Sequence, residues 1–441
     1  MRRIGRARDF GPRLYGFGEE KATGRSCMLL SALLSSVITW LSGGMFYTSF
    51  LMVNGINIVN VGIISFVPFI ANCFAIFSPS ILERFQRRKA VLAWSRAAYY
   101  TLSILAITLL PEAVQEPELR LVLFVAVTFA ANIINALFTS GYSVWHVNFI
   151  PDQVRARYFS SSQLVTAFAG QGAALLSSFL ADALAGSAYQ NTIIVVFRYA
   201  AYALGLLDVY FLTRPVEYPY SHSAARPRFR DIFAKPLRHR PFAVVMALIF
   251  AWNFSANLPA GALNYYLIDS VGASYTFVYL INMVYPFTIL LLMRPAQRMV
   301  RQEGWLKTFA WTAMLTAPTN MLYAFVTAGT YLWLMPVVRI LQHILGVGLN
   351  LAYANLPYIH LPREDQTNYM SFHILTVNIG AFLGMMLGTW FVGITQGWQL
   401  TILGTGLSGV QILLFAQGVG QWGIGLAILP MLRWLEPRDS L

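Results

Sequence analysis

The feature that most constrains this fold is a series of twelve apolar runs. A helix that crosses a membrane needs about 20 mostly apolar residues. The runs cover residues 27–51, 58–82, 90–110, 120–144, 160–184, 191–213, 242–267, 274–293, 306–328, 331–356, 369–394 and 408–432. A helix satisfies its own backbone hydrogen bonds where water is absent, so the runs predict an all-α membrane protein with twelve transmembrane helices.

The composition supports a membrane protein and excludes several other classes. Hydrophobic residues make up 57% of the chain and charged residues only 11%, against about 25% charged in a soluble domain. The net charge of +13 could suggest nucleic acid, but the chain has no nucleic-acid-binding motif, so we expect no such partner. Cys27 and Cys73 both lie in apolar segments, and their spacing predicts neither a disulfide framework nor a metal site.

No motif in the sequence predicts catalysis. We find no HExxH zinc motif, no phosphate-binding P-loop and no nucleophile elbow. Two glycine patterns, Gly404–Gly409 and Gly418–Gly423, match the dinucleotide fingerprint, but neither follows a strand in a βαβ unit. We therefore expect no enzyme activity and no cofactor.

Basic residues divide unequally between the two sides of the predicted membrane protein. The termini and the even-numbered connections carry 27 of the 31 Lys and Arg residues, whereas the other connections carry only Arg120. Basic residues concentrate in cytoplasmic loops. The pattern therefore predicts a multi-pass protein of the cell membrane with both termini in the cytoplasm.

A passage near the middle of the chain is repeated 211 residues later. Pro151, Tyr158 and Leu164 in the first copy correspond to Pro362, Tyr369 and Leu375 in the second. The match extends to small residues that recur every four positions: Ala169, Ala173 and Ser177 against Gly380, Gly384 and Gly388. Both copies follow an even-numbered helix, so the sequence predicts two parallel six-helix repeats. The small residues predict close helix packing.

The repeat and the charges together predict the domain organisation. A tail (1–26) precedes a first six-helix half (27–213), and a linker (214–241) leads to a second half (242–432) and a tail (433–441). The linker is a charged tether, or it contains a short amphipathic helix at Phe229 to Leu237 on the lipid headgroups.

This architecture resembles the major facilitator superfamily of secondary transporters. The family's motif between helices 2 and 3 has charged positions that four residues here match: Glu83, Arg84, Arg87 and Arg88. Pro79 and Gln86 replace the motif's two glycines. The resemblance implies that this loop stabilises a cytoplasmic gate. Positive charge on the cytoplasmic side alone would also explain the arginines.

By the same resemblance, helices 1, 4, 7 and 10 surround a central cavity. In the tenth predicted helix Arg339, His343, Gly346 and Asn350 share one helix face. Arg339 lies about 13 Å from the outer end at 1.5 Å per residue, close to the middle of the membrane. An arginine beside a histidine suits an anionic or strongly hydrogen-bonding solute. Arg339 could instead bind backbone carbonyl groups or join the two halves.

Three other cavity helices carry polar or aromatic faces. The first predicted helix carries Ser36, Trp40, Gly43 and Tyr47, the fourth carries Asn132, Asn135 and Thr139, and the seventh carries Trp252, Asn253 and Asn257. Amide side chains can bind a solute, but they also hold membrane helices together. We select Trp40, Tyr47, Asn132, Asn135, Asn253 and Asn257 as candidate solute contacts beside Arg339, His343 and Asn350.

These features predict a transporter that moves a small polar organic solute, with an anion as one option, by alternating access. No Asp or Glu lies near the middle of predicted helices 1, 4, 7 or 10, which by the same resemblance argues against an exporter of cationic drugs. If protons are coupled, His343 is the expected carrier, because an unperturbed imidazole has a pKa of about 6.5. The alternatives are an exporter of neutral or amphipathic compounds, a lipid-handling protein, or a non-transporting sensor. The expected partners are the solute, a proton or other coupling ion, and lipid, around a monomer.

Overall fold

The computed structural model describes residues 14–147, 149–150, 152–217, 229–362, 366–402 and 405–435. Its first half contains α1 (Glu20–Ser42), α2 (Gly44–Val53), α3 (Ile58–Asn72), η1 (Cys73–Phe77), α4 (Ser78–Leu82), α5 (Lys89–Tyr100), η2 (Thr101–Ala106), α6 (Ile107–Ala113), α7 (Pro117–Val147), α8 (Asp152–Ala183) and α9 (Gln190–Leu212). A linker helix, α10 (Phe229–Arg238), follows. The second half contains α11 (Arg240–Asn257), α12 (Ala260–Tyr265), η3 (Tyr266–Ser270), α13 (Tyr275–Asn282), α14 (Val284–Glu303), α15 (Trp305–Tyr323), α16 (Tyr331–Asn355), η4 (Leu356–Tyr358), α17 (Gln366–Ile394), β1 (Leu400–Ile402), β2 (Thr405–Leu407) and α18 (Gly409–Leu435).

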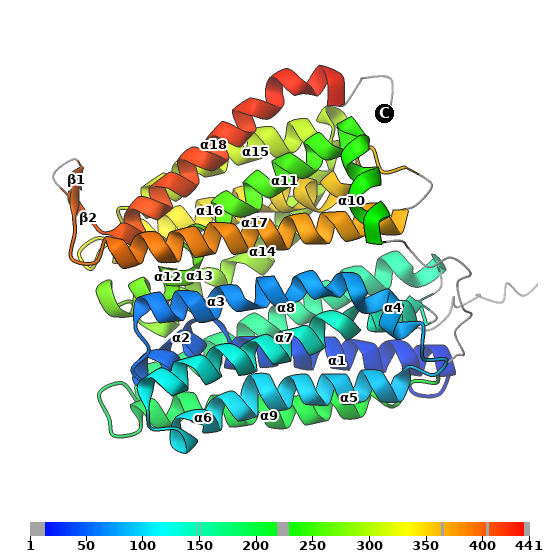
Figure 1. The fold of residues 1–441 in the computed structure, drawn as a ribbon, viewed down its shortest axis with the longest axis horizontal. Helices are drawn as coiled ribbons and strands as arrows, with labels where there is room; N and C mark the ends of the chain where they lie inside the picture. Colours follow the sequence, from blue (N-terminus) through cyan, green and yellow to red (C-terminus); the bar gives the residue numbers. More distant parts are fainter. Residues whose placement is uncertain are drawn as a thin grey trace, which may run out of the picture.

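The helices form two bundles that lie one above the other in Figure 1, and most helices are roughly parallel or antiparallel to their neighbours. The first half, from α1 to α9, makes the lower bundle, and the second half makes the upper one. The predicted all-α, twelve-helix fold is confirmed. Several spans contain two or three consecutive elements. The π-turns η2 and η3 interrupt two of them, and Gly44, the first residue of α2, adopts a φ of +54° where α2 follows α1.

Eleven spans in the described chain are long and apolar enough to cross a membrane. The remaining predicted span, the ninth (306–328), corresponds to α15, which is 19 residues long and carries Thr308, Thr312, Thr316, Thr319 and Asn320. These polar side chains are buried, and α15 packs against both α16 and α18. A helix that other helices enclose can be more polar than one that faces lipid.

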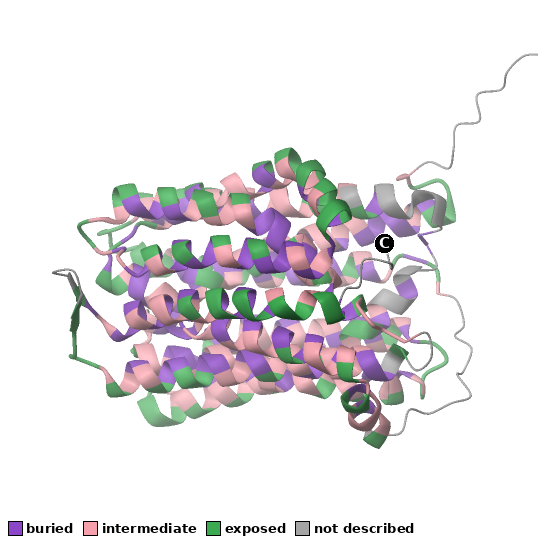
Figure 2. Ribbon diagram, turned by 90° about the horizontal axis from the view of Figure 1, so that it is seen from above, coloured by how far each residue is buried: buried purple, intermediate pink, exposed green. Residues whose placement is uncertain are grey.

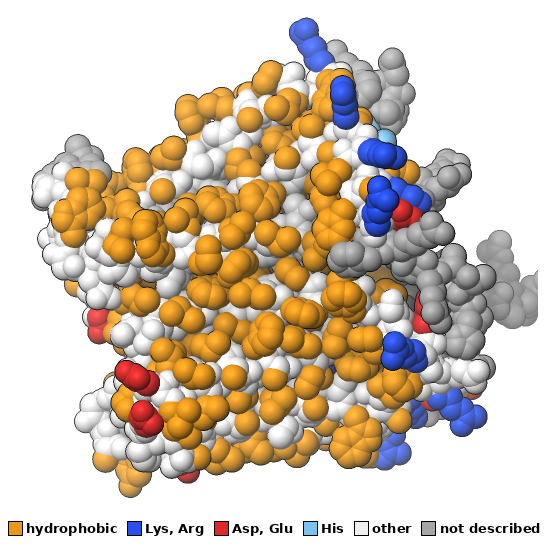
Figure 3. All heavy atoms as spheres, in the orientation of Figure 1, with side chains coloured by type: hydrophobic (Ala, Val, Ile, Leu, Met, Phe, Trp, Pro, Cys, Tyr) orange, Lys and Arg blue, Asp and Glu red, His pale blue; other side chains and the backbone are white. Residues whose placement is uncertain are grey.

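The outer surface is apolar between its two ends. Large apolar side chains such as Trp94 and Leu291 are about three-quarters exposed, at 76% and 75%, and Figure 2 shows buried and exposed residues alternating along the helices. In Figure 3 hydrophobic side chains cover the middle of the visible face, and Lys and Arg gather at the end where α10 and the C-terminus lie. We call this end the basic end. This distribution is that of a multi-pass membrane protein.

The small residues of α17 allow it to pack closely on α11. A Cβ atom at Gly380 would lie 2.8 Å from the carbonyl oxygen of Phe250, and one at Gly384 or Gly388 would collide with the carbonyl oxygen of Phe254 or Leu258. The predicted close packing of this stripe is therefore present in the second half.

The repeated tyrosines have matching roles at the basic end. Tyr158 packs against Tyr15 in the segment before α1, with ring centroids 6.1 Å apart. Tyr369 packs against Phe242, with centroids 4.9 Å apart, and donates a hydrogen bond to the carbonyl of Lys235 in α10. Each tyrosine thus fastens the segment that leads into the first helix of its own half.

Two elements lie outside the twelve spans. Residues Phe229–Arg238 form the helix α10, at the place where the second linker alternative expects a short amphipathic helix. It packs against the protein, because Ile232 is buried and Phe233 contacts the ring of Phe372 in α17. The antiparallel pair β1 and β2, in which Leu400 faces Leu407, forms a hairpin that the sequence did not predict.

Candidate solute-binding site

Helix α16 brings Arg339, His343, Gly346 and Asn350 to one cavity of about 490 Å³. Their spacing of four, three and four residues keeps them on one side of a continuous helix. The volume lies within the usual range for small-molecule sites, roughly 300–1,000 Å³. The structure therefore places the predicted polar face of this helix at an internal cavity rather than against lipid.

Arg339 has no negatively charged partner among the residues that the structure describes. Its Nη2 donates to Asn282 Oδ1 at 2.8 Å, and its Nη1 donates to Gln342 Oε1 at 3.1 Å. Its Nε is buried without a hydrogen-bond partner, and the guanidinium lies 5.9 Å from the ring centroid of Tyr323. Among the described residues, the ion pairs do not include Arg339. Neutral amide oxygens thus stabilise the guanidinium, and its positive charge remains uncompensated.

A chain of amide side chains extends from Arg339 to α18. Gln342 Nε2 donates to Asn320 Oδ1 at 2.8 Å, and Asn320 Nδ2 donates to Gln421 Oε1 at 2.6 Å. Each amide accepts through its oxygen and donates through its nitrogen, so the chain fixes all three orientations. The oxygen of Gln342 is thereby directed at Arg339. This network holds the arginine in place from α15, α16 and α18.

His343 has an unsatisfied ring nitrogen in the same cavity. Its Nε2 is buried without a partner, and its ring lies 5.4 Å from the ring of Tyr285. The hydroxyl of Tyr285 accepts a hydrogen bond from Asn350 Nδ2 at 3.0 Å. A bound solute could therefore meet one unpaired imidazole nitrogen and one guanidinium nitrogen on adjacent turns of α16.

Both halves contribute to the cavity. Trp40 of α1 and Gln171 of α8 line it from the first half, and Trp252 of α11 lines it from the second. Gln171 Oε1 is buried without a hydrogen-bond partner. A solute in this position would touch both halves, as alternating access requires. Trp40, a candidate contact from the sequence, thus lines this cavity.

Five other candidate contacts do not line this cavity: Tyr47, Asn132, Asn135, Asn253 and Asn257. Asn132 and Asn257 donate to carbonyl groups of their own helices, and Asn253 also donates to the Tyr353 hydroxyl at 2.7 Å. Asn135 accepts from Thr139, and Tyr47 lies 5.2 Å from the Arg198 guanidinium. In this state of the protein these side chains join turns or helices.

Several cavity residues were not predicted from the sequence. Asn282, Tyr285, Asn320 and Gln421 come from the eighth, ninth and twelfth spans, which are not among the four helices expected to surround the cavity. A signal was available, because amides are costly in lipid and each of these spans carries one at mid-helix.

The predicted gate loop lies at the basic end between α4 and α5. Arg84 and Arg87 are exposed, whereas Arg88 is buried and its Nε donates to the carbonyl of Phe85 at 3.3 Å. Glu83 is half-buried, and its backbone nitrogen donates to the carbonyl of Pro79. The sequence did not predict that Glu217, after α9, accepts hydrogen bonds from the backbone nitrogens of Arg88 and Lys89.

The two halves are joined by hydrogen bonds at the end opposite the basic end. Asp182 of α8 accepts from the backbone nitrogens of Tyr275 and Thr276, at 3.2 and 2.7 Å, and so caps α13. The hydroxyls of Ser49 and Tyr275 lie 2.5 Å apart. Tyr279 packs edge-on against Trp40, with ring centroids 5.7 Å apart. This end is closed above the cavity that contains Arg339.

No protein-family model matches the chain, and no curated protein matches its sequence. Solved structures match along almost the whole length. A single-residue mutant of the nucleoside transporter NupG is 13% identical with a TM-score of 0.69, covering 92% of this chain and 99% of its own. A D-xylose–proton symporter is 11% identical with a TM-score of 0.66, covering 93% and 98%.

A third match is a bacterial homologue of the iron transporter ferroportin in an inward-facing state. It is 15% identical with a TM-score of 0.67, covering 92% of this chain and 98% of its own. These identities are low, whereas the coverage includes both halves in the same order. The chain therefore has the fold of the major facilitator superfamily.

Proposed function

We propose that this protein is a secondary transporter that moves a small polar organic anion by alternating access. The observation that carries the proposal is Arg339, a guanidinium that has no carboxylate partner in the described part of the chain and lies in a cavity lined by both halves. An unpaired charge is costly in a membrane interior. A bound anion would remove that cost and gain a charge-assisted hydrogen bond.

The proposed orientation places the basic end in the cytoplasm. Lys and Arg gather at that end in Figure 3. Arg120, the single basic residue of the opposite connections, donates to the carbonyls of Val114, Asn54 and Gln115, so it serves the local loop structure. With the opposite end closed, the described state would be open toward the cytoplasm. In intact cells, a cysteine introduced at position 223, which lies outside the described residues, should then react only with reagents that cross the membrane.

The solute classes of the structural neighbours bear on this proposal in different ways. A nucleoside and D-xylose are polar organic solutes of the size that this cavity could hold. Iron is a cation, which the uncompensated charge of Arg339 would repel. Among the described residues there is no group of three His, Cys, Asp or Glu side chains that could hold a metal ion. We therefore favour an organic solute.

A binding experiment tests the role of Arg339. Thermal unfolding of the purified protein against panels of anionic, neutral and cationic metabolites should show stabilisation by anions. Arg339→Gln should weaken anion binding at least tenfold, because a hydrogen bond to a charged group contributes roughly 1.5–3 kcal/mol. Arg120→Gln is the matched control, because it removes the same charge far from the cavity, and it should bind anions normally. Equal anion binding by both variants and the parent would refute the anion site.

Transport itself needs a separate measurement. Proteoliposomes that contain the protein should accumulate the best anion from the panel, and Arg339→Gln proteoliposomes should not. If binding occurs without accumulation or exchange in either direction, the protein is a sensor on a transporter fold.

A further inference from the structure

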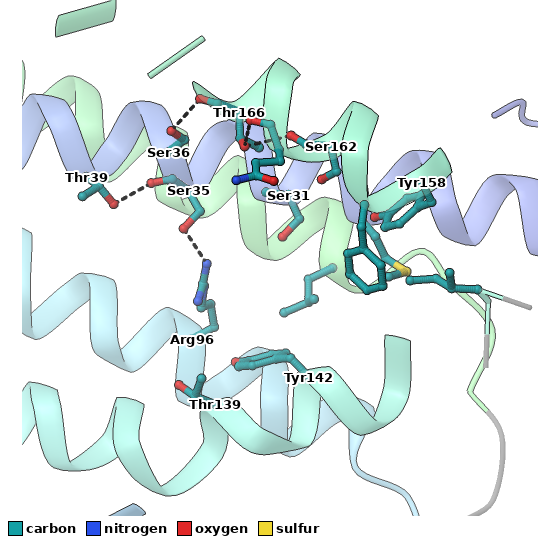
Figure 4. A pocket seen from close by; sticks show the side chains of 16 residues that line it. Ser31, Ser35, Ser36, Thr39, Arg96, Thr139, Tyr142, Tyr158, Ser162 and Thr166 are labelled. Carbon is teal, nitrogen blue, oxygen red and sulfur yellow. Dashed lines mark hydrogen bonds between the residues drawn. The ribbon is translucent and has the colours of Figure 1, made fainter. Parts of the chain in front are cut away.

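A second cavity, of about 840 Å³, lies within the first half, and it is lined by α1, α5, α7 and α8. It contains an unusual density of hydroxyl groups, among them Ser35, Ser36, Thr39, Thr139, Tyr142 and Thr166. Figure 4 shows these side chains around Arg96, which reaches from α5 toward Ser35 of α1. Ser36 and Thr139 lie on predicted polar faces, whereas Arg96 was not predicted.

The hydroxyl groups present acceptor atoms to the cavity. Ser36 donates its proton to the carbonyl of Thr166 at 2.9 Å, Thr39 to that of Ser35 at 2.8 Å, and Thr139 to that of Asn135 at 2.6 Å. A hydroxyl has one proton and two lone pairs, so each oxygen can still accept. The wall therefore favours a solute that donates hydrogen bonds.

Arg96 adds a fixed donor to this wall. Its Nε donates to Asp208 Oδ2 at 3.0 Å, and its Nη2 donates to Ser35 Oγ at 3.0 Å. Its side chain remains 18% exposed, whereas that of Asp208 is fully buried. Asp208 also accepts from Ser31 and from Tyr100, at 2.5 and 2.6 Å. The carboxylate holds the guanidinium from behind and does not face the cavity.

The two cavities follow one another along the same helices. Thr39 lines the hydroxyl-rich cavity and its neighbour Trp40 lines the cavity of Arg339. On α8, Thr166 and Gln171 are separated by about 7.5 Å at 1.5 Å per residue and line the first and second cavity respectively. The two cavities are therefore neighbours along α1 and α8.

We propose that the hydroxyl-rich cavity is a second binding site, specific for a polyhydroxylated solute. The Arg96–Asp208 pair is neutral, so this site selects hydroxyl groups, which both donate and accept, and does not select charge. This inference rests on the proposed transport function and extends it: the solute carries several hydroxyl groups, and an anionic group where Arg339 binds it. The hydroxyl-rich site holds the solute on the basic-end side of Trp40.

Three six-carbon probes separate the two sites in the purified full-length protein. Gluconate has hydroxyls and a carboxylate, sorbitol has hydroxyls alone, and hexanoate has a carboxylate alone. Affinities would be measured by calorimetry or thermal shift. We expect gluconate to bind more tightly than hexanoate, by roughly two- to tenfold for each hydroxyl engaged.

Thr139→Val replaces a cavity hydroxyl with a methyl group of similar size. It should weaken sorbitol and gluconate by roughly two- to tenfold and leave hexanoate unchanged. Thr376→Val in α17 is the matched control, because the Thr376 hydroxyl also donates to a carbonyl four residues earlier, that of Phe372, but lines neither cavity. It should change none of the three affinities.

The outcomes distinguish the two proposals. If sorbitol does not bind, or if Thr139→Val and Thr376→Val have equal effects, the hydroxyl-rich site is overturned whatever happens at Arg339. If Arg339→Gln leaves hexanoate binding unchanged while Thr139→Val weakens sorbitol, the anion proposal fails and the hydroxyl-rich site stands. Support for both requires Arg339→Gln to weaken hexanoate and gluconate but spare sorbitol.

Discussion

Asp182 offers the sharpest test of how the closed end is held. This half-buried carboxylate, at the end of α8 in the first half, accepts from the backbone nitrogens of Tyr275 and Thr276 in the second half. A helix N-terminus carries unpaired N–H groups and a partial positive charge. Asp182→Asn keeps an oxygen acceptor but removes the negative charge. It should therefore weaken the contact between the halves without creating a cavity.

The magnitude follows from two contributions. A capping side chain contributes about 0.5–2 kcal/mol, and a charge at a helix terminus about 0.3–1 kcal/mol. Asp182→Asn removes the charge contribution and part of the capping contribution, so we expect the closed state to lose about 1 kcal/mol of stability. Asp182 makes this contact only while the end is closed. The loss should therefore shift the equilibrium toward the open state by roughly fivefold.

A cysteine behind the closed end reports this equilibrium. Met45 in α2 is 3% exposed, and Cys27 and Cys73 can be replaced to leave Met45→Cys as the single thiol. Its rate of labelling by a membrane-impermeant maleimide added outside should rise roughly fivefold with Asp182→Asn. Ser274→Ala is the control, because Ser274 caps the same helix from within the second half by accepting from Phe277. Its labelling rate should equal that of the parent.

Two results would contradict the reasoning. An unchanged labelling rate in Asp182→Asn would mean that the cap does not hold the halves together. An equal increase with Ser274→Ala would mean that α13 has merely become less stable.

Four further substitutions have defined outcomes. Glu217→Ala should lower the free energy of unfolding by about 1 kcal/mol, measured by thermal denaturation, because it removes the cap of α5. Gly388→Ala should lower it by about 1–3 kcal/mol, because the added methyl collides with the carbonyl of Leu258; Gly423→Ala in open space is its control. Glu83→Ala should slow transport while the amount of protein in the membrane stays constant, and a normal rate would exclude the gate role. Anion binding should strengthen as the pH falls, because a bound anion favours protonated His343. His343→Gln should flatten this pH dependence in a binding assay. An unchanged pH dependence in the variant would mean that another group takes up the proton.

The sequence predicted the fold well because the membrane simplifies the problem. Twelve apolar runs and the division of basic residues define spans with little dependence on tertiary contacts. The stripe of Gly380, Gly384 and Gly388 identified a close helix contact for the same reason, since only small residues permit it. The hairpin Leu400–Leu407 was missed because its residues are as apolar as those of the helix that follows.

The candidate site was predictable only along single helices. Arg339, His343 and Asn350 share a face of α16, which a period of 3.6 residues reveals. Their partners Asn282 and Asn320 come from other helices, and no periodicity within one span indicates which of its faces meets another span. The asparagines of α7 and α11 also form polar faces, but the amides of Asn132, Asn253 and Asn257 donate to carbonyl groups one turn earlier.

Three arginines within the described spans show what separates a structural cation from a binding one. Arg198 is 1% exposed, and it donates to Thr108 and to the carbonyls of Ser42, Ser103 and Ile104 beside two aromatic rings. Arg96 has a carboxylate behind it and acts as part of a neutral pair. Arg339 has neither full burial nor a carboxylate, and its Nε is unpaired in a cavity. Moving a charge out of water costs several kcal/mol unless a partner offsets it. For Arg198 and Arg96, partners within the protein offset this cost. At Arg339 a solute anion would supply the missing interaction, and it would bind more tightly for that reason.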